Sequence, residues 1–271
     1  MLVSTLGYSL MNALVKELSH LPVFEIVFFR SIITVVLCVG ILRSSKVPLI
    51  GNNQKPLILA AIGGVTSMLL FFYTVQNIPF GASVVLKYLA PIFAAVLAVL
   101  ILKEKVKPIQ WFFFLLSFFG LILMKGFDFR IDNFNLLIGL AGALVTGLTW
   151  IAIKRIGKTE HPLTVVNYMM ICGTIVAGVY CFFDWKTPSN YDYWLLLLAG
   201  LSGFIGQWFI TKAFQVELAS NIAPLKYLEV FFALIVGFIW FDESYELLSF
   251  VGILMILSGM LMNVFYQQRK A

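Results

Sequence analysis

Charge is scarce in this sequence. Only 12% of the 271 residues are Asp, Glu, Lys or Arg, whereas an ordinary soluble domain has about a quarter. Hydrophobic residues make up 61% of the chain. This composition excludes an ordinary soluble globular protein and indicates an integral membrane protein with the lipid bilayer as a partner. The net charge of +6 would suggest nucleic acid in a soluble protein, but here we expect no nucleic-acid partner.

Cysteine and histidine are also rare. Cys38, Cys172 and Cys181 are scattered through apolar segments without the spacing of a metal or redox motif, so we interpret them as packing residues. His20 and His161 stand in short segments, each just before a proline. The sequence therefore predicts no metal site and no bound cofactor.

Catalytic motifs are missing as well. The sequence contains no GxSxG, HExxH, Walker or GxGxxG pattern. A lipid-modifying transferase or an intramembrane protease would need a Ser/His dyad or an Asp pair at membrane depth, and the apolar segments contain neither. We therefore predict that the protein is not an enzyme.

Long apolar runs dominate the chain. A transmembrane helix needs about 17–25 mostly apolar residues, and ten runs of about this length are bounded by charged, Pro and Asn residues. The sequence predicts an all-α integral membrane protein with ten transmembrane helices. The runs cover residues 1–16, 22–42, 57–77, 81–102, 108–126, 135–154, 163–183, 193–213, 219–241 and 247–266.

Basic residues between the runs are distributed unevenly. Cytoplasmic loops of membrane proteins carry an excess of Lys and Arg. This rule predicts a multi-pass protein of the cell (inner) membrane with both termini in the cytoplasm. The first run lacks the basic segment and cleavage site of a signal peptide. The cytoplasmic set is Arg43, Lys46, Lys55, Lys103, Lys105, Lys107, Lys154, Arg155, Lys158, Arg269 and Lys270, and the opposite set is Lys16, Lys125, Arg130 and Lys186.

The sequence contains an internal repeat. A shift of 139 places Leu86–Glu104 on Leu225–Glu243, and the letters LKYL recur at the start of both segments. The chain is thus interpreted as two halves of five helices, residues 1–126 and 135–266. Because five is odd, the second half must cross the membrane upside down. Inverted repeats of this kind are typical of transporters with a substrate site near the midplane. A non-transporting accessory protein is the weaker alternative.

Two segments carry a family resemblance. LPVFEIVFFRS at 21–31 and APLKYLEVFFALIVGFIWFDES at 223–244 resemble the second and ninth helices of the EamA-like branch of the drug/metabolite transporter superfamily. The second segment is similar to that of the S-adenosylmethionine transporters and amino-acid exporters of this superfamily. The resemblance implies a membrane carrier of small organic metabolites, often an exporter, without a cofactor.

Six ionisable residues interrupt the apolar runs, although a charge at the bilayer centre costs about 2.5–3.5 kcal/mol. Glu25 and Arg30 form either a structural ion pair or part of a cavity wall. Lys87 lies four residues before Pro91, which cannot donate to the Lys87 carbonyl. A helix interruption facing a cavity is therefore predicted, and a lysine that extends to the headgroups is the alternative. The other three are Lys212, Lys226 and Glu229.

Lys226 and Glu229 share a helix face, because they are three residues apart. They form either a structural pair or a contact to substrate. Further candidates are aromatic side chains that could stack on a substrate and polar side chains that could bond it. The predicted substrate-binding residues are Lys87, Tyr88, Lys226, Tyr227, Glu229, Arg30, Glu25, Gln76, Gln215, Trp150 and Asn12.

These residues lead to a functional prediction. Four cations and two anions within the runs favour a substrate that carries a carboxylate. We expect a secondary transporter of a small polar metabolite, an amino acid or a compound like S-adenosylmethionine, acting as a monomer or homodimer. The alternative on the same fold is a phosphorylated or lipid-linked anion.

Overall fold

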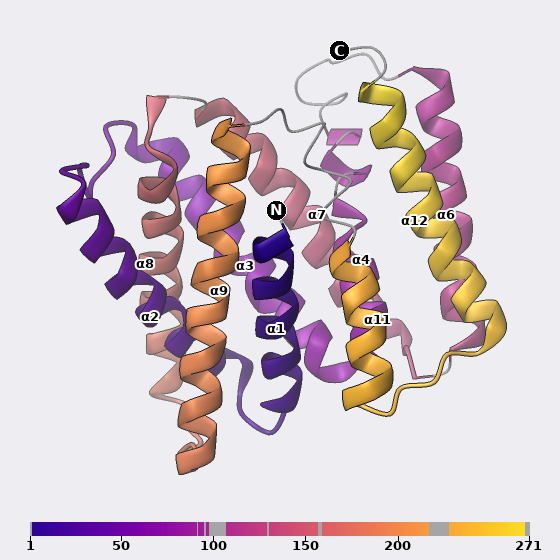
Figure 1. The fold of residues 1–271 in the computed structure, drawn as a ribbon, viewed down its shortest axis with the longest axis horizontal. Coiled ribbons are helices and arrows are strands. Elements are labelled where there is room, and N and C mark those ends of the chain that lie inside the picture. The colour runs from indigo at the N-terminus through magenta and orange to yellow at the C-terminus, as the bar shows by residue number, and fades with distance from the viewer. Residues whose placement is uncertain are drawn as a thin grey trace.

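The computed structural model describes residues 2–90, 92–94, 96–97, 107–128, 130–156, 159–216 and 228–268. Side chains are described for these residues except 126–127, 154–155, 210–216 and 267–268. Helices make up nearly all of this part of the chain, which contains no strand (Figure 1). They are α1 (Leu2–Glu17), α2 (Val23–Ser44), α3 (Gln54–Asn77), α4 (Phe80–Lys87), α6 (Pro108–Phe127), α7 (Asn133–Ile156), α8 (Pro162–Cys181), α9 (Asn190–Val216), α11 (Leu228–Trp240) and α12 (Leu247–Gln268).

Prolines mark where several helices begin. Proline is tolerated in the first turn because its missing N–H would have no partner inside the helix. Pro108 and Pro162 start α6 and α8, and Pro22 and Pro79 immediately precede α2 and α4. The helix boundaries thus follow from local sequence.

The outer surface of the bundle is strongly apolar. Six helices, α2, α3, α6, α7, α8 and α12, are each long and apolar enough to cross a membrane. Large side chains such as Phe182 and Phe183 are 89% and 84% exposed. So much exposed apolar surface marks a contact with membrane or protein, and helices satisfy their own backbone hydrogen bonds in lipid.

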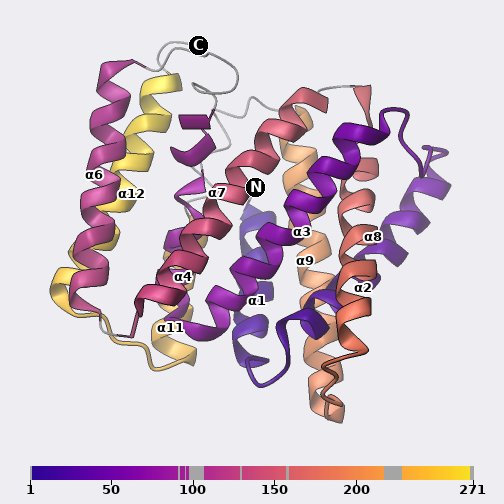
Figure 2. The same cartoon turned by 180° about the vertical axis from the view of Figure 1, so that it is seen from behind.

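Each helix of the first half packs mainly against a helix of the second. The five principal pairs are α1 with α9, α2 with α8, α3 with α7, α4 with α11, and α6 with α12. Figures 1 and 2 show α6 and α12 as a separate pair at one side of the molecule. The core therefore lies between the two halves of the chain.

Two glycines allow α6 and α12 to approach closely. A Cβ on Gly120 would lie 2.6 Å from the Gly252 carbonyl oxygen, and a Cβ on Gly259 would lie 2.5 Å from the Phe113 carbonyl oxygen. Polar side chains join the same helices, because Gln110 Nε2 donates to Asn263 Oδ1 at 2.9 Å. Backbone contact explains why small residues occupy both positions.

We expect Gly259→Ala to destabilise the protein, because the new methyl group would force α6 and α12 apart. Overpacking of this kind costs about 2 kcal/mol, or roughly 4–8 °C in Tm for a chain of this size. Thermal unfolding of the purified protein measures the loss. Gly40→Ala is the control, since its methyl group would meet nothing within 4 Å. Equal Tm values for the two variants would contradict the packing argument.

Candidate functional site

A buried carboxylate, Glu229, lies at the centre of the polar interior. Glu229 is 2% exposed and stands in the first turn of α11. Its Oε1 accepts hydrogen bonds from Asn12 Nδ2 at 3.0 Å and Lys87 Nζ at 3.3 Å, and its Oε2 accepts from the Tyr88 hydroxyl at 2.8 Å. Residues of α1, α4 and α11 therefore meet at a single acid.

Lys87 is the last residue of regular helix in α4, which agrees with the predicted interruption there. Tyr88 N–H bonds the carbonyls of Val84 and Val85, and Leu89 N–H bonds that of Leu86. These shorter turns tighten the backbone. Lys87 and Tyr88 both reach Glu229 from this irregular segment.

Aromatic rings complete the surroundings of the lysine. Lys87 Nζ lies 4.3 Å from the centre of the Phe71 ring and 5.5 Å from that of Tyr8. Both distances lie within the range of cation–π attraction. Lys87 is therefore held inside the protein by an acid and two rings instead of extending to the headgroups.

Arg30 forms a second charged centre with different neighbours. Its side chain is 6% exposed in the middle of α2. Arg30 Nε lies 3.1 Å from Met11 Sδ and one terminal nitrogen lies 3.8 Å from Met170 Sδ, while Met68 Sδ is also in contact. The Phe72 ring centre lies 5.7 Å away. Among the described residues, no carboxylate pairs with Arg30.

The two charged centres belong to one continuous region. On α3, Phe72 contacts Arg30 and Phe71 contacts Lys87. The centres of these two rings lie 6.1 Å apart. On α1, Tyr8 lies within electrostatic reach of both Arg30 and Glu229. A guanidinium and an ion pair thus face the same interior between the halves.

Two other predicted site residues have local partners elsewhere. Gln76 donates to the carbonyls of Leu18 and Leu21, which fixes the α1–α2 connection. Glu25 accepts from the Lys186 backbone N–H at 3.2 Å and forms no ion pair with Arg30. Of the two predicted alternatives for Glu25 and Arg30, the ion pair is therefore not formed, because Glu25 bonds the α8–α9 connection and Arg30 contacts methionines of other helices.

The remaining predicted residues are exposed or fall outside the described residues. Trp150 is 39% exposed on α7. Lys226 and Tyr227 fall outside the described residues, as do Pro91 and the side chains of Lys212 and Gln215. The pairing of Lys226 with Glu229 therefore stays a prediction.

Several site residues were missed by the sequence analysis. Tyr8 had a usable signal, because it stands four residues before Asn12 and shares its helix face. Phe71 and Phe72 had none, since nothing separates them from the other Phe residues, of which there are 26 in all. The methionines around Arg30 belong to three different helices, and their convergence depends on tertiary packing.

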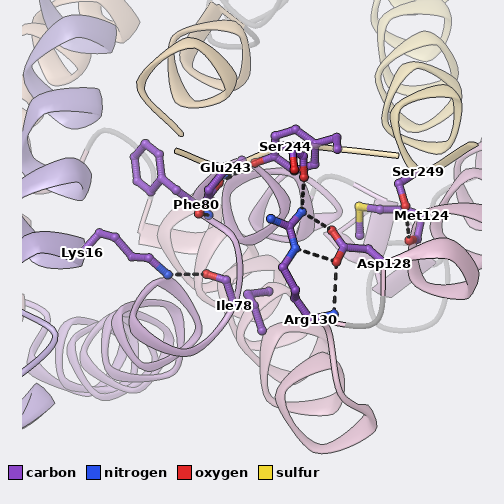
Figure 3. A network of polar contacts seen from close by, with 11 residues as sticks. Lys16, Ile78, Phe80, Met124, Asp128, Arg130, Glu243, Ser244 and Ser249 are labelled. Atoms are coloured by element: carbon purple, nitrogen blue, oxygen red, sulfur yellow. Dashed lines mark hydrogen bonds and ion pairs between the residues drawn. The ribbon is translucent and has the colours of Figure 1, made fainter. Parts of the chain in front are cut away.

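A polar network joins several helix connections at one end of the bundle (Figure 3). Arg130 donates to Asp128 Oδ2 at 2.8 Å and to the Ser244 carbonyl at 2.6 Å, joining the α6–α7 and α11–α12 connections. The bond to Asp128 raises the pKa of Arg130. Glu243 Oε1 accepts from the Phe80 N–H at the start of α4, and Lys16 Nζ donates to the Ile78 carbonyl.

Comparison with known proteins identifies relatives over the whole chain. The model of the EamA-like transporter family matches residues 1–126 and again residues 133–265. The pseudopaline exporter CntI of Pseudomonas aeruginosa is 29% identical over 253 residues, covering 92% of this chain and 89% of the relative. The S-adenosylmethionine uptake transporter of Rickettsia prowazekii is 27% identical over 278 residues, covering 100% and 92%.

Two further comparisons also cover most of the chain. Mouse (Mus musculus) solute carrier family 35 member G1 is 27% identical and covers 89% of this chain, which spans 70% of that relative. A solved protein crystal structure superimposes with a TM-score of 0.69 at 13% identity, covering 98% of both chains. At that identity, the likeness shows the fold alone.

Proposed function

Because the chain belongs to the EamA-like transporter family, we propose that it is a secondary transporter that moves a small carboxylate-bearing metabolite by alternating access. Membership of this family, within the drug/metabolite transporter superfamily, makes the protein a multi-pass membrane transporter and not an enzyme. The relatives named as transporters of pseudopaline and S-adenosylmethionine support a small organic substrate. An amino acid or related compound fits the site described above.

The proposal rests on Arg30, a buried cation that pairs with no carboxylate in the described part of the chain. An ionisable residue within a transmembrane segment is costly and usually pairs with another group or marks a transport pathway. Arg30 contacts methionine sulfurs and a ring where a carboxylate would be the ordinary partner. Guanidinium binds carboxylate with two parallel hydrogen bonds. A substrate carboxylate would supply the missing partner and leave again when transport is complete.

The arrangement of helices supports two inverted halves of five spans each. In the repeat, the first helix of one half corresponds to the first helix of the other, and so on: α1 to α7, α2 to α8, α3 to α9, α4 to α11, and α6 to α12. If the two halves are exchanged, the α1–α9 contact becomes the α7–α3 contact, which is also present. The other three contacts each join two corresponding helices and are therefore unchanged. The contacts of Gly120 with Gly252 and of Gly259 with Phe113 are also exchanged by the shift of 139. A twofold axis in the membrane plane accounts for all of these relations.

The charged end of the bundle supports an alternating-access cycle. Lys16, Arg130 and Lys186, which the sequence assigns to the outside, each bond a carbonyl of another connection at this end. With both termini in the cytoplasm, the network in Figure 3 closes the outer side. Rocking of the halves would break these bonds and open the site outward.

Paired substrates test the need for a carboxylate. We expect reconstituted vesicles to transport members of an amino-acid and metabolite library that carry a carboxylate and to discriminate about 10-fold or more against their methyl esters and amides. Loss of one charged hydrogen bond is worth about that factor. Vesicles without protein are the control. Equal transport of a carboxylate and its ester would sink the proposal, and transport confined to phosphate esters would establish the alternative cargo.

A further inference from the structure

The surroundings of Lys87 have the composition of a binding site for an ammonium ion. Glu229 supplies the negative charge, and the rings of Phe71 and Tyr8 supply the aromatic walls. Asn12 is fully buried and donates through Nδ2 to Glu229, while its Oδ1 has no hydrogen-bond partner among the described residues. An acid, a free carbonyl oxygen and ring faces are what a protonated amine requires. The chain's own lysine fills this site.

A second position for the lysine ammonium lies next to the first. A cavity of about 10 Å³ beside Lys87, close to the size that holds one water molecule, is lined in part by Thr74, Ser83 and Thr146. Each of these hydroxyls donates its proton to a carbonyl of its own helix, at 2.7 Å in every case. Their oxygens therefore keep lone pairs with which to accept hydrogen bonds from an ammonium.

Lys87 borders both the position beside Glu229 and the cavity lined by the hydroxyls. Lys87 is 29% exposed although Glu229 is 3% exposed at the side chain, so the lysine borders open space and the acid does not. A flexible four-carbon stem allows an ammonium to change partners more readily than a guanidinium does. On α7 the cavity is also lined by Gly139, Gly142 and Ala143, which carry no polar side chain that would compete for the hydroxyls.

From these observations we propose that Lys87 is a displaceable counter-ion that occupies the ammonium subsite of the transport site. A substrate amine takes its place on Glu229, and the lysine moves to the hydroxyls of Thr74, Ser83 and Thr146. The inference rests on the proposed function and sharpens it. Arg30 binds the carboxylate of the substrate and Glu229 binds its amine, so the substrate is a zwitterion.

Methylammonium chloride is the probe, because it carries the amine without a carboxylate. Its binding is measured through the rise of Tm with concentration, at an ionic strength held constant with potassium chloride. Removing an internal competitor raises apparent affinity. We expect Lys87→Ala to bind methylammonium with a half-saturating concentration about 10-fold lower than wild type. Glu229→Gln in the Lys87→Ala background should abolish that binding.

Thr146→Val separates a displaceable lysine from a fixed ion pair. In the otherwise native protein it removes an acceptor for the displaced lysine, so methylammonium should bind about 3-fold to 10-fold more weakly. In the Lys87→Ala background it should have no effect. Thr149→Val is the matched control, because Thr149 also bonds the carbonyl four residues earlier but does not line the cavity.

Each result is decisive for the proposal. Equal methylammonium binding by Thr146→Val and wild type would overturn it, even if Lys87→Ala failed to fold. An effect of Thr146→Val that persists without Lys87 would do the same. A protein that discriminates carboxylates from esters yet fails these tests would leave the proposed function standing and refute the zwitterion. A protein that passes the methylammonium tests but transports a carboxylate and its ester equally would refute the proposed function and keep the ammonium site.

Discussion

Replacing Arg30 by methionine should stabilise the protein and stop transport. The guanidinium is buried without a carboxylate among the described residues and is surrounded by the sulfurs of Met11, Met68 and Met170. A buried charge without a partner carries a desolvation cost of several kcal/mol. A methionine of similar length would pack among the same sulfurs without that cost. We expect a gain of about 2 kcal/mol, or roughly 4–8 °C in Tm.

Although Arg30→Met should raise stability, it should reduce transport. A charged hydrogen bond to the substrate is worth about 1.5–3 kcal/mol, so uptake of a carboxylate-bearing substrate into vesicles should fall at least about 10-fold. Arg30→Lys should recover part of the loss, because it restores the charge without the planar fork. Arg43→Met, at an exposed position of the same helix, should change neither the Tm nor the uptake. A less stable Arg30→Met protein with normal transport would assign Arg30 a structural role.

Much of the fold follows directly from the sequence. Apolar runs bounded by charges mark segments in which a helix must satisfy its own backbone, and each predicted run overlaps one of the described helices, six of which are long and apolar enough to cross a membrane. The predicted family is confirmed, because it rests on whole segments of sequence. The interruption at Lys87 was also predictable from a lysine close to a proline.

Partners across the bundle were harder to predict. Spacing predicted that Lys226 and Glu229 form a structural pair or contact substrate, and this stays a prediction because Lys226 lies outside the described residues. The bonds of Glu229 to Asn12, Lys87 and Tyr88, which come from other helices, were not predicted. Local spacing reveals neighbours on one helix but not on the helix opposite. Arg30 is the clearest case, because its neighbours on other helices are methionines that resemble any other packing residue in sequence.

Replacing Glu229 by leucine should have the largest effect on stability. It leaves the ammonium of Lys87 without its acid and leaves the donors of Asn12 and Tyr88 without their acceptor. Removing one partner of a buried ion pair costs about 3–5 kcal/mol, which corresponds to a fall of roughly 6–20 °C in Tm. Glu246→Leu, just before α12 and exposed, should change Tm little.

Adding Lys87→Met to Glu229→Leu should restore most of the lost stability, because it removes the ammonium that has lost its acid. The interaction between the two changes should be at least about 2 kcal/mol, at the upper end of the range seen for coupled sites, and transport should stay absent. Additive losses in Tm would show that Lys87 and Glu229 do not depend on each other. If displaced Lys87 binds the hydroxyl cavity, Thr146→Val should deepen the defect of Glu229→Leu but not that of the double variant. The stability of these variants therefore reports whether the lysine has a second position even before a substrate is identified.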